Sequence, residues 1–149
     1  MPEKLWRQVK RHMPIPCVDI ILQNSQDQIL VGWRLIPAYQ GVWALPGGRI
    51  FKSETLIAAA QRTLVQYGVT FRDLFLVGVF PVRLASRSDL TVCVAGNYLS
   101  GTATPDGVEF SSFRWSRHPH GMGGNYRRMI ARWAAMKRRP EALRFNKLC

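Results

Sequence analysis

Three charged residues, Arg49, Glu54 and Arg62, follow a Gly-Gly pair, and the first of them is placed where an anion could bind. Arg49 comes directly after Gly48, five residues separate Gly48 from Glu54, and seven more separate Glu54 from Arg62. The planar fork of arginine can donate two hydrogen bonds to phosphate oxygens, and a helix N-terminus adds backbone donors that favour an anion. Arg49, together with Arg34 at the end of an earlier predicted strand, is therefore a candidate for binding phosphate groups. A surface arginine without this role is the alternative at both positions.

The stretch from Trp43 to Gly68 carries these residues and predicts a short strand, a Gly-Gly turn and a helix in that order. Apolar residues recur at helical spacing in its second half, so that one helix face can pack inward. Ser53 is a candidate N-cap, and Glu54 in the first turn suits the positive end of the helix dipole. Gly68 is a stop signal. We therefore expect a helix over residues 54–66, packed beside a sheet.

The spacing from Gly48 through Glu54 to Arg62 resembles the first half of the Nudix box, the signature of the Nudix hydrolase family. The resemblance implies that Glu54 and Arg62 pair and brace the loop against the helix, and a separation of about two helical turns allows this contact through the loop. We also expect Arg62 to be partly buried. The second half of the family's box holds a divalent metal with glutamates. At those positions this chain has the neutral residues Thr63, Gln66 and Tyr67.

Within this family, the chain resembles the GDP-mannose mannosyl hydrolase subgroup, most clearly up to Gly68. The matching segments are VDIILQNSQDQILVGWR, QGVWALPGGRI and a later FRW strand. They carry Asp19, Arg34, Arg49 and Arg62 at positions that are charged in the subgroup. The resemblance implies that Asp19, Arg34 and Arg49 bind the substrate, with Asp19 near the sugar or another charged residue. A simple strand-edge aspartate is the alternative for Asp19.

The subgroup resemblance also implies a single Mg²⁺ or Mn²⁺ ion, held by a box glutamate, a backbone carbonyl near the glycines and a later loop residue. The corresponding candidates in this chain are Gln66, the Gly48 carbonyl and Glu109. The amide of Gln66 is a much weaker magnesium ligand than a carboxylate, and Glu109 could supply the one missing carboxylate. An ordinary loop charge is the alternative for Glu109. We expect divalent cations to bind weakly without nucleotide.

A loop histidine is the general base in the subgroup, and Phe110 takes its position here. His118 or His120 could substitute, because histidine transfers protons near neutral pH. The alternative for each is a loop histidine without a catalytic role. The candidate catalytic residues are therefore Glu109, His118 and His120.

Hydrophobic patterns predict strands over 18–22, 29–33, 74–84, 90–99 and 113–115, and helices over 1–12 and 125–139. Asn125 is the candidate cap of the last helix. Gly78 and Pro81 predict a break in the third strand, and the third and fourth strands are expected to form a hairpin. This order predicts an α/β fold, a mixed sheet with helices on both faces. It resembles the Nudix α/β/α sandwich.

Length and composition favour one domain over residues 1–149, since 47% of the residues are hydrophobic and the chain is long enough to bury a core. The formal net charge of +12 favours anionic partners, either nucleotides, polyphosphates or nucleic acid. No apolar run reaches the roughly 20 residues of a membrane helix, and the basic N-terminus lacks the apolar core of a secretory signal. We therefore expect a cytoplasmic protein without a membrane partner.

The three cysteines have no metal-ligand spacing. Cys17 and Cys93 fall in predicted strands, where buried structural thiols are expected. Cys149 is terminal and is expected to be exposed. A catalytic cysteine is the less favoured alternative, because no motif places a partner histidine.

These patterns leave three functions open. The favoured one is a Nudix-type hydrolase of a nucleoside diphosphate linked to another group, with a nucleoside diphosphate sugar such as GDP-mannose as the preferred substrate. The second is a Nudix-fold protein that binds or senses a nucleotide without turnover. The third is a nucleic-acid-binding module that uses the basic last helix, and it ranks last because the aromatic-basic pattern of single-strand platforms is missing. A homodimer is implied only by the subgroup resemblance.

Overall fold

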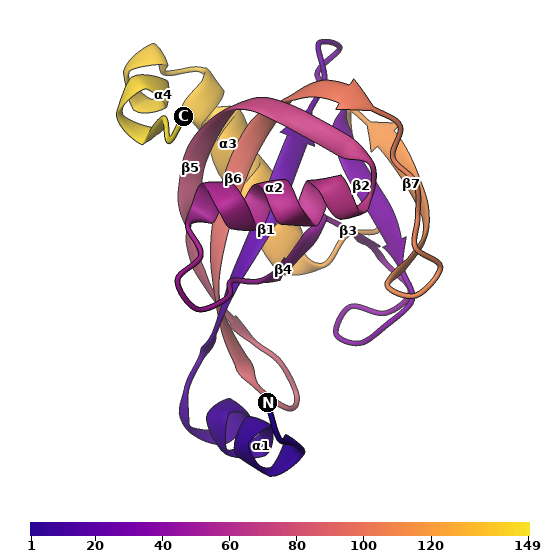
Figure 1. The fold of residues 1–149 in the computed structure, drawn as a ribbon. Coiled ribbons are helices and arrows are strands. Elements are labelled where there is room, and N and C mark those ends of the chain that lie inside the picture. The colour runs from indigo at the N-terminus through magenta and orange to yellow at the C-terminus, as the bar shows by residue number, and fades with distance from the viewer.

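Seven strands and four helices make up the computed structural model, which describes all 149 residues (Figure 1). The strands are β1 (Ile15–Gln23), β2 (Ile29–Arg34), β3 (Trp43–Ala44), β4 (Gly47–Arg49), β5 (Val69–Arg83), β6 (Ser88–Gly101) and β7 (Phe110–Ser116). The helices are α1 (Glu3–His12), α2 (Leu56–Gln66), α3 (Gly124–Lys137) and α4 (Pro140–Asn146). No helix is both long enough and apolar enough to cross a membrane.

The strands form one mixed sheet in the order β3-β2-β1-β6-β5, with β4 paired to β1 and β7 paired to β2. β1 and β6 run parallel, whereas the other pairs are antiparallel. Val18, Ile20, Ile21 and Leu22 of β1 are all fully buried. These apolar residues are interrupted only by Asp19 and lack the alternation of a half-exposed strand, which reflects a strand that is covered on both faces.

Two hydrophobic clusters fill the space between the sheet and the helices on its two faces. On one face, Ala60 and Leu64 of α2 pack against Ile20 and its neighbours. On the other face, Met129 and Trp133 of α3 pack against residues of β1, β2 and β5. The predicted α/β class, with a mixed sheet between helices, is therefore confirmed.

The start of α2 differs from the prediction. The helix begins at Leu56 instead of residue 54, and its N-cap is Thr55, whose hydroxyl accepts a hydrogen bond from the Ala58 N–H at 3.1 Å. Ser53 has a positive φ of 66° and lies outside the helix. The prediction of Ser53 as the cap was wrong because two residues of turn separate it from the helix. Gly68 has a φ of +79° directly after the helix end, as its stop signal indicates.

The predicted Gly-Gly turn is instead the short strand β4, in which Gly47 pairs with Asp19 and Gly48 with Val18 of β1. Neither glycine has a positive φ. A Cβ atom at residue 47 would clash with Asp19 Oδ1 and would lie 2.7 Å from the Val18 carbonyl oxygen. Gly47 is therefore required by the close approach of the Asp19 side chain, and this contact sets Asp19 against the start of the box.

Several strands extend beyond their predicted bounds. β5 and β6 form the predicted hairpin but run over Val69–Arg83 and Ser88–Gly101, and β7 begins at Phe110 instead of 113. The ladder shifts register between Leu76 and Gly78, near the predicted break, while Pro81 stays in the ladder. β5 is an edge strand, where the missing N–H of a proline is tolerated. No sequence pattern above indicates α4.

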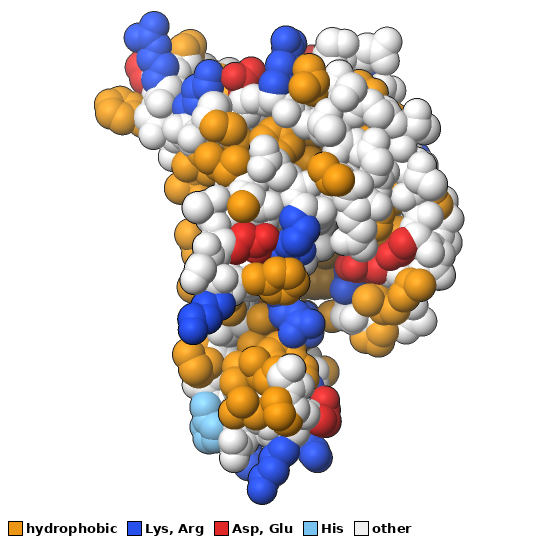
Figure 2. Space-filling view, viewed as in Figure 1, with side chains coloured by type: hydrophobic (Ala, Val, Ile, Leu, Met, Phe, Trp, Pro, Cys, Tyr) orange, Lys and Arg blue, Asp and Glu red, His pale blue; other side chains and the backbone are white.

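α1 lies at one end of the molecule beside the tip of the β5–β6 hairpin, away from α2 and α3 (Figure 1). None of its residues is buried. On the face seen in Figure 2, Lys and Arg side chains lie over α1, beside α2 and near α4, with uncharged and acidic side chains between them. On this face the basic side chains are spread out instead of gathered into one patch.

Candidate active site

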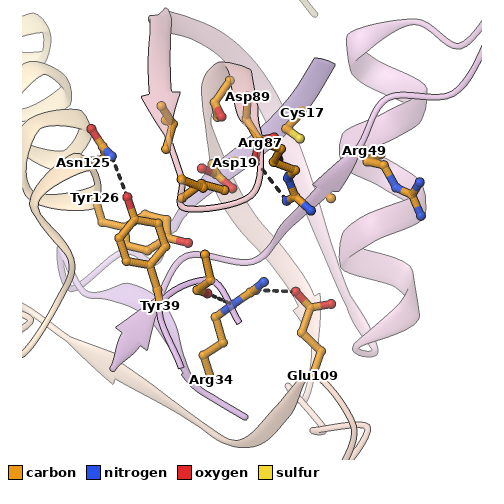
Figure 3. A pocket seen from close by; sticks show the side chains of 15 residues that line it. Cys17, Asp19, Arg34, Tyr39, Arg49, Arg87, Asp89, Glu109, Asn125 and Tyr126 are labelled. Atoms are coloured by element: carbon orange, nitrogen blue, oxygen red, sulfur yellow. Dashed lines mark hydrogen bonds and ion pairs between the residues drawn. The ribbon is translucent and has the colours of Figure 1, made fainter. Parts of the chain in front are cut away.

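A cavity of about 200 Å³ is enclosed by β1, β4, the loop after β2, the β5–β6 hairpin and the start of α3 (Figure 3). Its charged lining consists of Asp19, Arg34, Arg49, Arg87, Asp89 and Glu109. The backbone of Gly48 lines it as well. The structure thus brings together the three residues predicted to bind substrate with two of the three predicted metal ligands.

The ionisation of the Asp19 carboxyl group in this cavity is strongly perturbed. Burial raises the pKa of its carboxyl group to about 7, and the negative charges of Asp89 and Glu109 add to this effect. The positive charge of Arg34 opposes this rise in pKa, and no hydrogen bond to the Asp19 carboxylate lowers the pKa further. A carboxyl group with this pKa can both accept and release a proton near neutral pH.

Arg34 is held between a carboxylate and a loop. Its Nη1 donates to Glu109 Oε1 at 2.6 Å, and its Nε donates to the carbonyl oxygens of Ala38 at 2.5 Å and Ile36 at 3.1 Å. The second oxygen of Glu109 accepts a hydrogen bond from the Tyr67 hydroxyl at 3.3 Å. Burial, together with the charge of Glu109, raises the pKa of Tyr67, so its hydroxyl remains a donor at neutral pH.

A second arginine–carboxylate pair lies on the hairpin. Arg87 Nε donates to Asp89 Oδ1 at 2.7 Å and its Nη2 donates to Oδ2 at 3.1 Å, which is the bidentate geometry. Beside this pair, burial raises the pKa of the Cys17 thiol to about 12. Cys17 and Cys93 are buried and Cys149 is exposed, as expected. A protonated Cys17 is a poor nucleophile, so its position in the cavity wall does not make it catalytic.

Arg49 is linked to both the box and α1. Its guanidinium lies over the ring of Trp6 at 4.7 Å from the centroid, and its carbonyl oxygen accepts a hydrogen bond from Arg62 Nη2 at 2.8 Å. No carboxylate pairs with Arg49, which leaves its charge uncompensated at the cavity rim. Trp6 thus joins α1 to the site, a contact that the sequence patterns did not indicate.

The ion pair expected between Glu54 and Arg62 is present. Arg62 Nε and Nη2 donate to Glu54 Oε1 at 2.7 Å and Oε2 at 2.9 Å, and the Phe51 N–H donates to Glu54 Oε2 at 2.9 Å. The hydrogen bond from Arg62, followed by that from Phe51, lowers the pKa of Glu54 to about 2. The Arg62 side chain is 35% exposed. The pair joins the loop after β4 to α2 and supports the backbone of Arg49.

The predicted metal donors do not form a complete metal site. Gln66 is exposed and does not line the cavity, and both oxygens of Glu109 are engaged by Arg34 and Tyr67. Thr63, at the first missing box glutamate, is 2% exposed, and its hydroxyl has no hydrogen-bond partner. No three side chains among His, Cys, Asp and Glu are grouped closely enough to hold a metal. These residues do not fit the divalent-metal site that the family resemblance implies.

His118 and His120 are exposed in the loop before α3 and do not line the cavity. The structure therefore does not bring either predicted general base to the site. Asn125, predicted to cap α3, instead donates from its side-chain amide to the Tyr39 hydroxyl at 2.6 Å in the cavity wall. The N-cap of α3 is Gly123.

The model of the NUDIX domain family matches residues 13–120. The chain belongs to the NUDIX family. A curated relative, the low-salt glycan biosynthesis protein Agl8 of Haloferax volcanii, is 32% identical to this NUDIX chain over 62 residues. That match covers 42% of this chain and only 39% of the relative.

Solved NUDIX structures share the fold. The MutT protein of Methanosarcina mazei superposes with a TM-score of 0.71 at 17% identity, over 86% of this chain and 99% of that one. The NUDIX domain of Shewanella oneidensis NrtR, solved with ADP ribose, gives a TM-score of 0.67 at 18% identity, over 91% and 98% of the two chains. Identities this low establish the shared fold alone.

Proposed function

We propose that this NUDIX chain hydrolyses a nucleoside diphosphate linked to a sugar, and that the diphosphate binds in the cavity between Arg34 and Arg49. The observation that carries this proposal is the cavity itself, which places a carboxyl group poised near neutral pH among arginines at the start of the box. The Haloferax relative is a glycan biosynthesis protein, which supports a sugar-linked substrate.

In this proposal the two arginines bind and orient the diphosphate. Arg34 is fixed by Glu109 and by loop carbonyls, so little side-chain freedom is lost when it contacts a phosphate oxygen. Arg49 has no carboxylate partner and supplies the uncompensated positive charge. Fixed positive charge of this kind stabilises the negative charge that develops on the leaving phosphate.

Asp19 is proposed as the general base. Its ionised form accepts a proton from the attacking water while the bond between the sugar and the diphosphate breaks at carbon or at phosphorus. The proton leaves the water as the new oxygen bond forms, and the electron pair of the broken bond goes to the departing oxygen. A pKa near 7 makes both protonation states of Asp19 accessible during turnover.

The volume of the cavity supports partial enclosure of such a ligand. At about 200 Å³ it is smaller than the roughly 300–1,000 Å³ of sites that enclose a whole ligand. The diphosphate and the adjoining sugar would occupy the cavity, and the nucleobase would lie outside it.

A turnover screen tests this function. Purified protein is incubated with nucleoside diphosphate sugars, dinucleoside polyphosphates and nucleoside triphosphates, each with Mg²⁺, with Mn²⁺ and with excess chelator. The proposal predicts release of product from at least one nucleoside diphosphate sugar. Hydrolysis confined to triphosphates or dinucleoside polyphosphates would overturn the substrate class.

A second function, nucleotide binding without turnover, is favoured by one specific observation. Helix α2, which carries the second half of the box, has no carboxylate side chain, and no cluster of side chains replaces the family's metal site. The NUDIX domain of NrtR, solved with ADP ribose, is an example of the fold with such a ligand. Calorimetric binding of a nucleotide by a protein that turns over no member of the panel would establish this alternative.

A further inference from the structure

We propose that the guanidinium group of Arg34 replaces the divalent cation at this site, so that the domain binds a diphosphate without metal. The inference rests on the proposed function for the identity of the ligand, but it concerns binding and does not require turnover. It is argued from the hydrogen bonds of Glu109, from the fixed position of Arg34 and from the residues on the inward face of α2.

Both oxygens of Glu109 already accept a hydrogen bond from a neighbouring side chain. Its Oε1 accepts from Arg34 at 2.6 Å and its Oε2 from Tyr67 at 3.3 Å, and only 24% of its side chain is exposed. A divalent cation bound to this carboxylate would lie within a few ångströms of the Arg34 guanidinium, where like charges repel.

Arg34 is fixed from the opposite side as well. The carbonyl oxygens of Ala38 and Ile36 accept from its Nε, and the side chain is only 15% exposed. The guanidinium therefore cannot leave Glu109 without rearrangement of the loop after β2. In Figure 3, Arg34 and Glu109 point toward each other in the cavity wall. A fixed planar cation in this position can donate to phosphate oxygens at no cost of reorganisation.

The inward face of α2 is neutral where the family's box has carboxylates. Thr63 and Tyr67 lie four residues apart on that face and are both buried. The Thr63 hydroxyl would lie 3.8 Å from a Cβ atom built on Gly48, so it faces the backbone that the family resemblance assigns to the metal. A hydroxyl and a phenol in these positions leave no negative charge on the helix for a second cation to neutralise.

The charges of the cavity balance without a metal. Glu109 is neutralised by Arg34, and Asp89 is neutralised by Arg87 through two hydrogen bonds. Arg49 and Asp19 are the two charged residues of the lining that have no such partner. When Asp19 is protonated, the lining carries a net positive charge from Arg49, which suits an anionic ligand.

Calorimetric titration with GDP, UDP and ADP, each in excess chelator and again in excess Mg²⁺, tests the inference. We expect at least one nucleotide to bind in both conditions. Its dissociation constant in chelator should agree within about twofold with that in Mg²⁺, because a metal bridge between protein and nucleotide would produce a larger difference. Binding that requires Mg²⁺, or no binding of any nucleotide in chelator, would overturn the inference.

Glu109→Gln provides a second arm with the opposite prediction from a metal site. The amide oxygen can still accept from Arg34, but the negative charge is gone, so nucleotide binding in chelator should tighten on the order of tenfold. Loss of a metal ligand would instead weaken binding. Glu141→Gln on α4, an exposed carboxylate removed from the cavity, is the matched control and should leave affinity unchanged.

The turnover screen separates the two proposals. Metal-independent nucleotide binding without turnover of any nucleoside diphosphate sugar would sustain this inference and overturn the proposed function. Turnover of a nucleoside diphosphate sugar that is abolished by chelator, together with Mg²⁺-dependent binding, would sustain the function and overturn the inference.

Discussion

Replacement of Asp19 by asparagine should stabilise the fold above neutral pH while it removes the proposed base. In the folded protein burial raises the pKa of Asp19 to about 7, whereas in the unfolded chain it ionises at about 3.9. Between these values the folded state keeps a proton that the unfolded state has released. The contribution of Asp19 to the stability of the wild-type protein therefore falls as pH rises from about 4 to about 7, and it is constant above that range.

The magnitude follows from the size of the shift. A rise of about three pKa units corresponds to about 4 kcal/mol at 1.36 kcal/mol per unit, which is an upper limit. Water that reaches the half-buried carboxylate through the cavity reduces this cost. We expect Asp19→Asn to raise the free energy of unfolding by about 1–3 kcal/mol at pH 8 relative to its effect at pH 4. Burial is the largest cause of the rise in the Asp19 pKa, which the charge of Arg34 opposes and the charges of Asp89 and Glu109 increase.

Urea unfolding of both proteins at pH 4 and pH 8 measures this difference. Comparison of the variant with wild type at each pH cancels the titration of all other groups, provided that Arg34, Asp89 and Glu109 keep their partners. Glu141→Gln should show no such difference between the two pH values. An Asp19→Asn effect that is the same at pH 4 and pH 8 would refute the reasoning, because Asp19 would then ionise normally in the folded protein.

Four further substitutions, one of them a matched control, test the site. Gly47→Ala should destabilise the fold by about 1–3 kcal/mol in urea unfolding, because its Cβ clashes with Asp19 and the β1 backbone. The matched Gly48→Ala should be tolerated, because the nearest atom to its Cβ is 3.8 Å away. Equal destabilisation by the two substitutions would contradict this prediction. Arg49→Ala should weaken nucleotide binding about tenfold in calorimetry, and unchanged affinity would remove it from the site. Arg62→Ala should lower the free energy of unfolding by about 1 kcal/mol, and an unchanged melting temperature would count against its brace.

Local spacing was a reliable guide to part of the site. Glu54 and Arg62 meet because two turns of helix and a short loop connect them, and this geometry is contained in the sequence interval itself. The family resemblance placed Asp19, Arg34 and Arg49 around one cavity, although periodicity alone could not have done so.

The remaining residues are brought to the cavity by tertiary pairing. Asp89 lies opposite Ile15 because β6 runs parallel to β1, and no local pattern encodes that register. Tyr39 and Asn125 meet through a loop and a helix start 86 residues apart in the sequence. The structure does not bring Gln66, the predicted metal ligand, to the cavity, because Thr63 and Tyr67, four residues apart, form the buried face and Gln66 is exposed.

The pH profile of kcat/KM for hydrolysis of a nucleoside diphosphate sugar tests the central claim most directly. If Asp19 is the base in the cavity, activity should rise with pH through an apparent pKa of about 7, and Asp19→Asn should lose about 10²–10⁴-fold in rate while nucleotide binding persists. Retention of the wild-type rate and pH profile by Asp19→Asn would contradict the account.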